Sequence, residues 1–212
     1  MPEVLHELEE KARPDRAALL LIDMVNDFLH PEGKTAVRAG RPIGQARAVI
    51  PSMRRLLEAA RSAGVLVLHC QHTTLPGGAS HSGPWLDARS RATYSVEDVC
   101  MEGSWGQQII DELCPVEGDV IVKKYRYSAF AGTNLDMVLR SAGRLTTICC
   151  GVSTNVCVEA TAREAFSHDY YVVVPSDACA SWDMALHEAT LASVKHRYGA
   201  VCMSEELVAL WT

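Results

Sequence analysis

Residues 145–161 read LTTICCGVSTNVCVEAT, and this stretch is the most informative part of the chain for predicting the fold and the chemistry. The first six are apolar or β-branched, which predicts a strand buried on both faces. Gly151 indicates a turn, and residues 153–155 (Ser-Thr-Asn) are types that cap helices. We therefore predict a strand, a turn and a helix over 157–167, with Cys157 in its first turn.

This predicted position gives Cys157 a chemical role. A thiol in the first helical turn lies at the positive end of the helix dipole, beside unpaired backbone N–H groups. Both features lower the pKa of a cysteine, and the N–H groups can hold the oxyanion that forms when a thiolate attacks a carbonyl. The alternative is a packing role, which is the commoner one for a single cysteine near a helix start.

Apolar runs alternate with helical patterns along the rest of the chain. The predicted strands are 17–22, 65–68, 120–122, 145–150, 170–174 and 200–203. The predicted helices are 43–62, 106–113, 134–141, 157–167 and 183–197, and in the last of these we expect Ala185, Leu186, Ala189, Leu191 and Val194 to face inward. This alternation predicts a single-domain α/β fold, a Rossmann-like three-layer sandwich with a six-stranded, mainly parallel sheet. Residues 1–16 are predicted to form an N-terminal arm, and 17–212 the domain.

The composition excludes several classes of protein. The chain has 212 residues, 48% of them hydrophobic, and a formal net charge of −6. The negative charge gives no support for nucleic-acid binding, and no apolar run approaches the roughly 20 residues that span a bilayer. The charged beginning of the chain lacks an apolar signal core, so we expect a cytoplasmic protein. The eight cysteines include no CxxC pair, so we expect reduced thiols and no zinc ribbon.

Charged residues stand at the ends of the first and third predicted strands. Asp23 follows the first strand, and Lys123 and Lys124 follow the third. The carboxyl ends of parallel strands meet at one edge, where α/β proteins bind ligands. If strands one, three and four are neighbours, Asp23, Lys124 and Cys157 converge. The acid would then take the thiol proton, and the lysine would steady the charges. The alternative for Asp23 is that it caps the loop.

Two further segments bear on function. His69, Gln71 and His72 follow the second predicted strand, but no carboxylate stands at a convincing spacing, so we expect neither a metal nor another cofactor. Residues 73–105 form a long irregular stretch, which predicts a lid or a subunit contact. No GxGxxG or GxxxxGK[ST] motif follows a strand, so a nucleotide binder has no support.

Four stretches resemble one known family. They are LLLIDMVNDF (19–28), KYRYSAFAGTNLDMVLR (124–140), CGVSTNVCVEATAREA (150–165) and DACAS (177–181). In these stretches the chain resembles the isochorismatase-like superfamily of cysteine hydrolases, and the resemblance extends over about 17–210. It implies a catalytic triad of Asp23, Lys124 and Cys157, with Lys124 rather than Lys123 chosen by register. It also implies a cis peptide between Val152 and Ser153, and an oxyanion hole formed by the amides of Ser153 and Cys157.

The resemblance also implies an activity. Family members that lack the cysteine cleave a vinyl ether, so Cys157 indicates covalent amide hydrolysis through a thioester with release of ammonia. The RYSAF stretch (126–130) is most similar to the ureidoacrylate and N-carbamoyl amidohydrolases, whereas the Asp-x-His metal site of nicotinamidases is missing from HCQHTTLP (69–76). The family's usual assembly implies a homodimer or homotetramer with a small-molecule amide substrate. Two alternatives remain: an isochorismatase-type hydrolase of a non-amide substrate, and a catalytically silent binding subunit.

Candidate substrate contacts are polar and aromatic residues near the predicted triad. Arg126 is either a carboxylate anchor or a solvent-exposed side chain. Family members commonly have Gln where Val25 stands here, and Asn26 could supply that polar contact. The full set of candidates is Asn26, Phe28, Trp105, Arg126, Tyr127 and Phe130.

Overall fold

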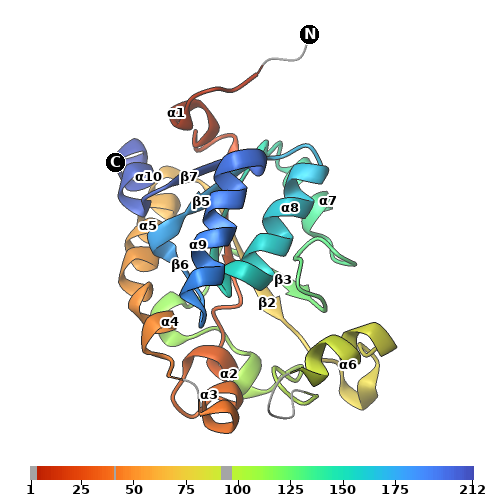
Figure 1. The fold of residues 1–212 in the computed structure, drawn as a ribbon. Coiled ribbons are helices and arrows are strands. Elements are labelled where there is room, and N and C mark those ends of the chain that lie inside the picture. The colour runs from red at the N-terminus through yellow and green to blue at the C-terminus, as the bar shows by residue number, and fades with distance from the viewer. Residues whose placement is uncertain (1–3, 41, 92–96) are drawn as a thin grey trace.

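The structure is a computed structural model that describes residues 4–40, 42–91 and 97–212. Within them a parallel seven-stranded sheet has the order β3-β2-β1-β4-β5-β7, and a short strand, β6, pairs with β4 (Figure 1). The strands are β1 (Ala17–Ile22), β2 (Leu66–His72), β3 (Val120–Lys124), β4 (Thr146–Val152), β5 (Tyr171–Pro175), β6 (Cys179–Ala180) and β7 (Ala200–Cys202). The predicted parallel α/β sandwich is therefore confirmed.

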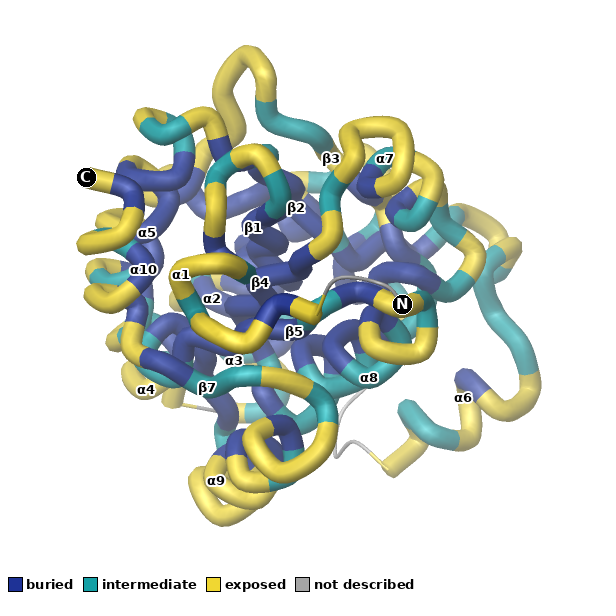
Figure 2. Tube along the Cα trace, turned by 90° about the horizontal axis from the view of Figure 1, so that it is seen from above, coloured by how far each residue is buried: buried dark blue, intermediate teal, exposed yellow. Residues whose placement is uncertain are grey.

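Helices cover both faces of the sheet. The α-helices are α1 (Leu8–Lys11), α2 (Asn26–Leu29), α3 (Lys34–Ala39), α4 (Gly44–Ala48), α5 (Ile50–Ala63), α6 (Gly83–Ser90), α7 (Leu135–Ser141), α8 (Glu159–Ser167), α9 (Met184–Ser193) and α10 (Ser204–Trp211). In Figures 1 and 2, α5 and α10 lie together on one side of the sheet, and α8 and α9 lie on the other. Every residue of β1 and β4 is buried, as expected for central strands covered on both faces.

Several predicted boundaries are wrong for local reasons. The predicted helix over 43–62 is divided into α4 and α5, because Pro51 stands in the first turn of α5 and has no N–H for a continuous helix. The predicted helix over 106–113 is two short 3₁₀ turns, Trp105–Gln107 and Asp111–Leu113. Helix α10 was not predicted. Strand β2 extends to His72, so His69, Gln71 and His72 lie within it rather than after it.

Gly151 is part of β4 and not a turn residue. Its φ is +126°, a conformation that side chains rarely permit. A Cβ atom there would lie 2.1 Å from the backbone oxygen of Ile22 on the neighbouring strand. A glycine is therefore required at this position so that β4 and β1 can pair closely where they approach the carboxyl edge.

The inward face of α9 also differs from the prediction. Ala185, Leu186 and Ala189 are exposed, whereas His187 and Thr190 are buried. Leu191 and Val194 are buried as expected. The two polar residues can lie inside because His187 Nδ1 hydrogen-bonds the Thr154 hydroxyl at 2.8 Å and the Thr190 hydroxyl donates to Glu159 at 2.7 Å. Their partners lie on other elements, which an apolar pattern does not reveal.

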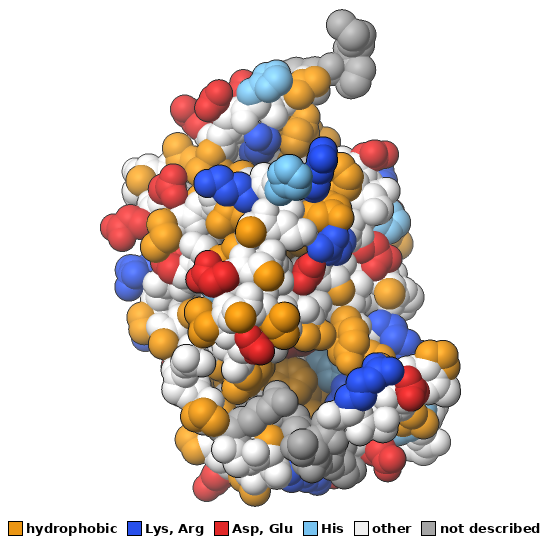
Figure 3. All heavy atoms as spheres, in the orientation of Figure 1, with side chains coloured by type: hydrophobic (Ala, Val, Ile, Leu, Met, Phe, Trp, Pro, Cys, Tyr) orange, Lys and Arg blue, Asp and Glu red, His pale blue; other side chains and the backbone are white. Residues whose placement is uncertain are grey.

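The described part of the N-terminal arm packs against the domain. The Leu5 N–H donates to the Tyr171 hydroxyl at 3.0 Å, and the Trp211 indole donates to the Ala12 carbonyl at 2.7 Å. The beginning of the chain is thus attached to β5 and α10. The division into an arm and a domain stays a prediction. None of the helices in the described residues has both the length and the apolar character needed to cross a bilayer. The face in Figure 3 carries interspersed acidic and basic side chains.

Candidate active site

Asp23 lies directly after β1 and is fixed by backbone contacts. Its φ of +57° is in the left-handed region, which few non-glycine residues adopt. Its N–H donates to the Cys70 carbonyl at 2.9 Å, and its Oδ1 accepts the N–H of His72 at 2.9 Å. Both contacts come from the adjacent strand β2. The carboxylate is therefore held at the carboxyl edge of the sheet with Oδ2 turned toward the other charged groups.

Lys124 is the last residue of β3 and is fully buried. Its Nζ lies 2.8 Å from Asp23 Oδ2 and donates to the Arg126 carbonyl at 3.1 Å. The condition for convergence, that strands one, three and four are neighbours, is met only in part: β1 pairs with β4, but β2 lies between β1 and β3. Lys124 is level with His72 of β2. It reaches Asp23 because a lysine side chain is long enough to extend past one intervening strand.

Cys157 lies in a π-helical turn, Thr154–Val158, which precedes α8. It is therefore not in the first turn of an α-helix, as the sequence predicted. Asp23 and Lys124 both lie close enough to its thiol to change the thiol pKa, since Lys124 lowers that pKa and Asp23 raises it. The Thr161 hydroxyl donates to the Cys157 carbonyl at 2.7 Å and accepts the Ala129 N–H at 3.0 Å. Thr161 thus attaches the cysteine turn to the segment that follows Lys124.

The pKa of the Cys157 thiol differs from the prediction, which expected it to be lowered. Burial raises the pKa of Cys157 to about 12, and Lys124 only partly offsets this. Burial also raises the pKa of Asp23, again against the effect of Lys124. Burial by itself lowers the pKa of Lys124, but Asp23 and Cys157 outweigh it, and the net pKa is raised. Burial outweighs the helix dipole here, because the dipole contributes only about 0.3–1 kcal/mol. The resting thiol is therefore protonated beside a charged lysine.

The raised thiol pKa predicts how Cys157 reacts in the free enzyme. Alkylation by iodoacetamide should rise about tenfold per pH unit from pH 7 to 10, since only the thiolate reacts. An ordinary thiol, such as that of glutathione, levels off above about pH 9. The measurement is the initial rate of labelling of the Cys157 peptide by mass spectrometry, with glutathione as the reference. A plateau reached between pH 7 and 8 would contradict the raised pKa.

The turn between β4 and Cys157 has an unusual backbone. The peptide bond between Val152 and Ser153 is cis. The Ser153 carbonyl accepts the N–H groups of Val156 at 3.1 Å and Val158 at 3.2 Å. This geometry places Ser153 at the N-terminal end of the turn that carries Cys157.

Side chains from more distant parts of the chain support this turn. His187 contacts Thr154, and the Ser181 hydroxyl donates to Asn155 Oδ1 at 2.6 Å. Ser181 belongs to the DACAS stretch, so the sequence indicated that it could be functionally important. Nothing in the sequence indicated the roles of His187 and Thr161, because their contacts depend on how α9 and α8 pack.

Comparison with known proteins identifies the family. The isochorismatase domain model matches residues 17–206. The ureidoacrylate amidohydrolase RutB of Agrobacterium fabrum (strain C58) is 35% identical over 175 residues, covering 78% of this chain and 76% of the relative. The chain belongs to the isochorismatase family.

Two solved structures agree with this membership. The cysteine hydrolase from Pseudomonas syringae pv. phaseolicola 1448A has a TM-score of 0.83 and 28% identity, with 93% of this chain and 92% of that chain covered. The N-carbamoylsarcosine amidase from Thermoplasma acidophilum has a TM-score of 0.71 and 30% identity, with 90% and 97% covered. The resemblance inferred from residues 19–28, 124–140, 150–165 and 177–181 is therefore confirmed.

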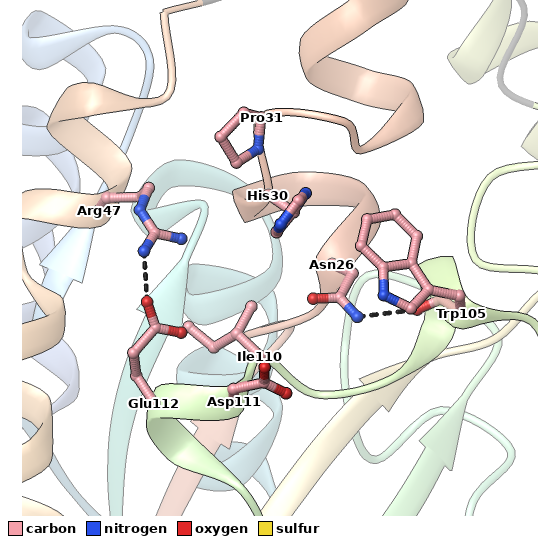
Figure 4. Close-up of a pocket in the computed structure, with 8 residues that line it drawn as sticks. All are labelled: Asn26, His30, Pro31, Arg47, Trp105, Ile110, Asp111 and Glu112. Carbon is pink, nitrogen blue, oxygen red and sulfur yellow. Dashed lines mark hydrogen bonds and ion pairs between the residues drawn. The ribbon is translucent and has the colours of Figure 1, made fainter.

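Two of the predicted substrate contacts in this isochorismatase-family chain line a pocket beside α2. Asn26 is buried and donates from Nδ2 to the Trp105 carbonyl at 3.0 Å, while Trp105 is 45% exposed (Figure 4). The His30 ring meets the Trp105 ring edge-on at 4.8 Å, and Arg47 pairs with Glu112 across the pocket. The full lining is Asn26, His30, Pro31, Arg47, Trp105, Ile110, Asp111 and Glu112, which does not include the triad.

The other predicted contacts divide between two places. Arg126 is half-buried and donates from Nη1 to the carbonyls of Ser80 at 2.9 Å and Tyr125 at 2.7 Å. Tyr127 lies 4.8 Å from the ring of Trp85. Phe28 lies 6.0 Å from the ring of His72, whose backbone holds Asp23. These three are therefore on the side of the triad.

Phe130 turns away from the triad. Its ring is buried and stacks on His168 at 5.0 Å, with Tyr170 5.9 Å away. His168 and Tyr170 both directly precede β5, at the amino edge of the sheet, whereas Asp23 and Lys124 stand at the carboxyl edge. The geometry gives Phe130 a packing contact there and not the predicted contact with substrate.

The two histidines of β2 have separate partners. They are three residues apart, so their side chains point to opposite faces of the strand. His69 Nε2 lies 3.1 Å from Asp119 Oδ2, whereas His72 Nε2 lies 3.3 Å from Arg89 Nη1. Among the described residues no group of three or more His, Cys, Asp or Glu side chains is arranged to hold a metal ion. The predicted long stretch 73–105 contains α6, and its residues 92–96 lie outside the described residues.

Proposed function

We propose that this chain is a cysteine-dependent amidohydrolase that cleaves a small N-carbamoyl (ureido) or carboxamide substrate through a thioester. The observation that carries the proposal is the buried Asp23–Lys124 pair, 2.8 Å apart, close enough to the buried Cys157 thiol for both charges to change its pKa. Relatives support the bond that is cleaved, since one is named for ureidoacrylate and another for N-carbamoylsarcosine. The chain is a hydrolase of amide C–N bonds, and the proposal adds the cysteine mechanism and the substrate class.

The first step makes the nucleophile. Asp23 accepts the proton of the Cys157 thiol as the sulfur attacks the carbonyl carbon, so an S–C bond forms while the carbonyl becomes an oxyanion. The raised pKa of Asp23 suits this role, because a carboxylate with a raised pKa is a better base than a surface acid. Lys124 keeps the Asp23 carboxylate ionised until it accepts the proton. The lysine charge then stabilises the negative charge on the Cys157 sulfur.

The second step releases the amine. The backbone N–H groups of Ser153 and Cys157, at the two ends of the turn, are the proposed donors to the oxyanion. As the oxyanion collapses, the C–N bond breaks and the departing nitrogen takes the proton from Asp23. A primary amide releases ammonia, and the acyl group remains on sulfur as a thioester.

The third step regenerates the enzyme. Water gives a proton to Asp23 as its oxygen adds to the thioester carbon. The second oxyanion then collapses, the C–S bond breaks, and the proton returns from Asp23 to sulfur. The product is the carboxylic acid or, for a ureido substrate, a carbamic acid. The homodimer or homotetramer implied by the family resemblance stays a prediction.

A substrate screen tests this function. Ammonia release should be measured with ureidoacrylate, other N-carbamoyl compounds, biuret, maleamate and nicotinamide, and kcat/KM should be highest for a ureido compound. Rapid quenching of that substrate should reveal an acyl adduct on Cys157 by intact mass. Turnover of isochorismate alone, or product formation with no adduct, would favour a non-amide hydrolase. No turnover of any compound would favour a binding subunit.

A further inference from the structure

The pocket beside α2 is separate from the triad and has no part in the three steps above. Its volume is about 400 Å³, which is in the usual range for a site that holds a small ligand. Asn26 and Trp105 line it, and none of the triad residues does. We propose that this pocket is a second binding site, which takes a small primary ammonium ion such as that of an alkylamine. The proposal does not depend on the proposed function.

Asn26 gives the pocket a buried hydrogen-bond acceptor. Its residue is 6% exposed, and its Nδ2 donates to the Trp105 carbonyl at 3.0 Å. Because a carbonyl can accept only from the amide nitrogen, this bond fixes which way the amide points. The side-chain oxygen is thereby directed into the space between the lining residues (Figure 4), and no group in the described part of the chain donates to it. An N–H group of a ligand would therefore be stabilised at this oxygen.

The charges that line the pocket leave one carboxylate unbalanced. Arg47 pairs with Glu112, and its Nη1 donates to the Leu29 carbonyl at 3.0 Å. Asp111 is exposed, and within residues 4–40, 42–91 and 97–212 it has no ion-pair partner. With histidine counted as neutral, the lining carries one negative charge in excess. The local field therefore favours a cation over an anion.

Trp105 provides an aromatic wall. It is 45% exposed, and its ring meets the His30 ring edge-on with the centroids 4.8 Å apart. This contact holds the indole in position and leaves a large part of it accessible. An ammonium ion is attracted to the π electrons of an aromatic ring, and tryptophan is the best of the aromatic residues for this interaction.

Backbone hydrogen bonds hold the walls of the pocket together. The Asn26 N–H donates to the Gln108 carbonyl at 2.9 Å, and the Ile110 N–H donates to the Met24 carbonyl at 3.0 Å. The beginning of α2 is thus tied to the segment that carries Asp111. Because these bonds exist without a ligand, binding needs little further ordering of the chain.

A primary ammonium ion suits this combination of groups better than other small ions. Its three N–H donors and its charge fit a site that offers a neutral oxygen, from Asn26, and a carboxylate, from Asp111. A carboxylate or phosphate ligand would be repelled by both of these groups. A quaternary ammonium ion keeps the charge and the attraction to Trp105, but it has no N–H group to donate.

Isothermal titration calorimetry with four probes tests this selectivity. The titrations are made at pH 7.5, where an alkylamine is protonated, and at constant ionic strength. We expect one n-butylammonium ion to bind per chain, and tetramethylammonium to bind at least about fivefold more weakly. Neither n-butanol nor butyrate should bind saturably. Equal affinity for n-butylammonium and n-butanol, preference for butyrate, or no saturable binding of n-butylammonium up to about 50 mM would overturn the proposal.

Variants of the lining test which groups hold the ion. Asp111→Asn removes the excess charge and keeps the shape of the side chain, so n-butylammonium should bind at least about tenfold more weakly. Glu117→Gln is the matched control, because Glu117 is an exposed acid of the same segment that does not line the pocket. Its effect should be less than about twofold. Trp105→Leu should also weaken binding, whereas Trp105→Phe should retain most of it. Unchanged binding in Asp111→Asn, or an equal loss in Glu117→Gln, would contradict the proposed site.

The variant Cys157→Ser separates this proposal from the proposed function. Cys157 does not line the pocket, so the variant should bind n-butylammonium with the same affinity as the natural chain although its turnover is lost. Loss of binding in Cys157→Ser would place the ion at the triad and overturn the second site. Failure of the natural chain to hydrolyse any amide, with binding of n-butylammonium intact, would overturn only the proposed function.

Discussion

Replacing Cys157 with serine is expected to lower kcat/KM for the best substrate by about 1,000-fold or more. The serine hydroxyl is far less acidic than the cysteine thiol. Asp23 therefore removes its proton much less readily, and the nucleophile is poorly activated. The variant should fold normally, because serine is nearly isosteric with cysteine and leaves the buried Asp23–Lys124 pair in place. The measurement is ammonia release, together with intact mass after quenching, in which the acyl adduct on sulfur should be lost.

Two other cysteines serve as controls for this variant. Cys114 is exposed, and Cys150 is buried in β4 with its thiol donating to the Leu20 carbonyl at 3.4 Å. Cys114→Ser and Cys150→Ser should both retain activity within about threefold, since neither thiol contacts the triad. Full activity in Cys157→Ser, or an adduct that persists in Cys157→Ala, would refute the cysteine mechanism.

Replacing Lys124 with methionine is expected to abolish detectable turnover and to lower the free energy of unfolding by about 3–5 kcal/mol. The variant keeps the volume of the side chain but leaves the carboxylate of Asp23 buried without its cation. An unpaired charge in the interior destabilises the folded state far more than an exposed ion pair stabilises it. The measurement is urea denaturation at pH 7, followed by circular dichroism.

The double variant Asp23→Asn with Lys124→Met isolates the cause. It removes both charges, so most of the lost stability should return while activity stays absent. The loss in the single variant should also shrink as the pH falls, because the raised pKa of Asp23 lets the folded state bind a proton before the unfolded state does.

Lys123→Met is the control. Lys123 is exposed and pairs with Glu102 at 2.7 Å, so its loss should cost at most about 1 kcal/mol. A Lys124→Met protein as stable as the natural one would show that the pair is not maintained in solution.

The sequence predicted the elements whose signals are local. The predicted strand 17–22 coincides with β1, because six consecutive apolar residues suit a central strand that is buried on both faces. The helix over 134–141 was predicted to within one residue of α7 for a similar reason. Boundaries failed where a proline, a π-helical turn or a short 3₁₀ turn changed the hydrogen bonding without changing the apolar pattern.

By itself, therefore, the sequence determined the parallel α/β fold, the family, and the three residues that meet at one edge of the sheet. The fold follows from apolar alternation, and the position of the charged residues follows from residue types at the ends of strands. The family, and Lys124 rather than Lys123 in the triad, follow from the resemblance of residues 19–28, 124–140, 150–165 and 177–181. Only the tertiary structure decided that Lys124 reaches past β2, that burial raises rather than lowers the pKa of the Cys157 thiol, and that Arg89 contacts His72. Each of these depends on which groups surround a side chain in three dimensions, since desolvation and long-range contacts are properties of the packed molecule and leave no periodic signal in the sequence.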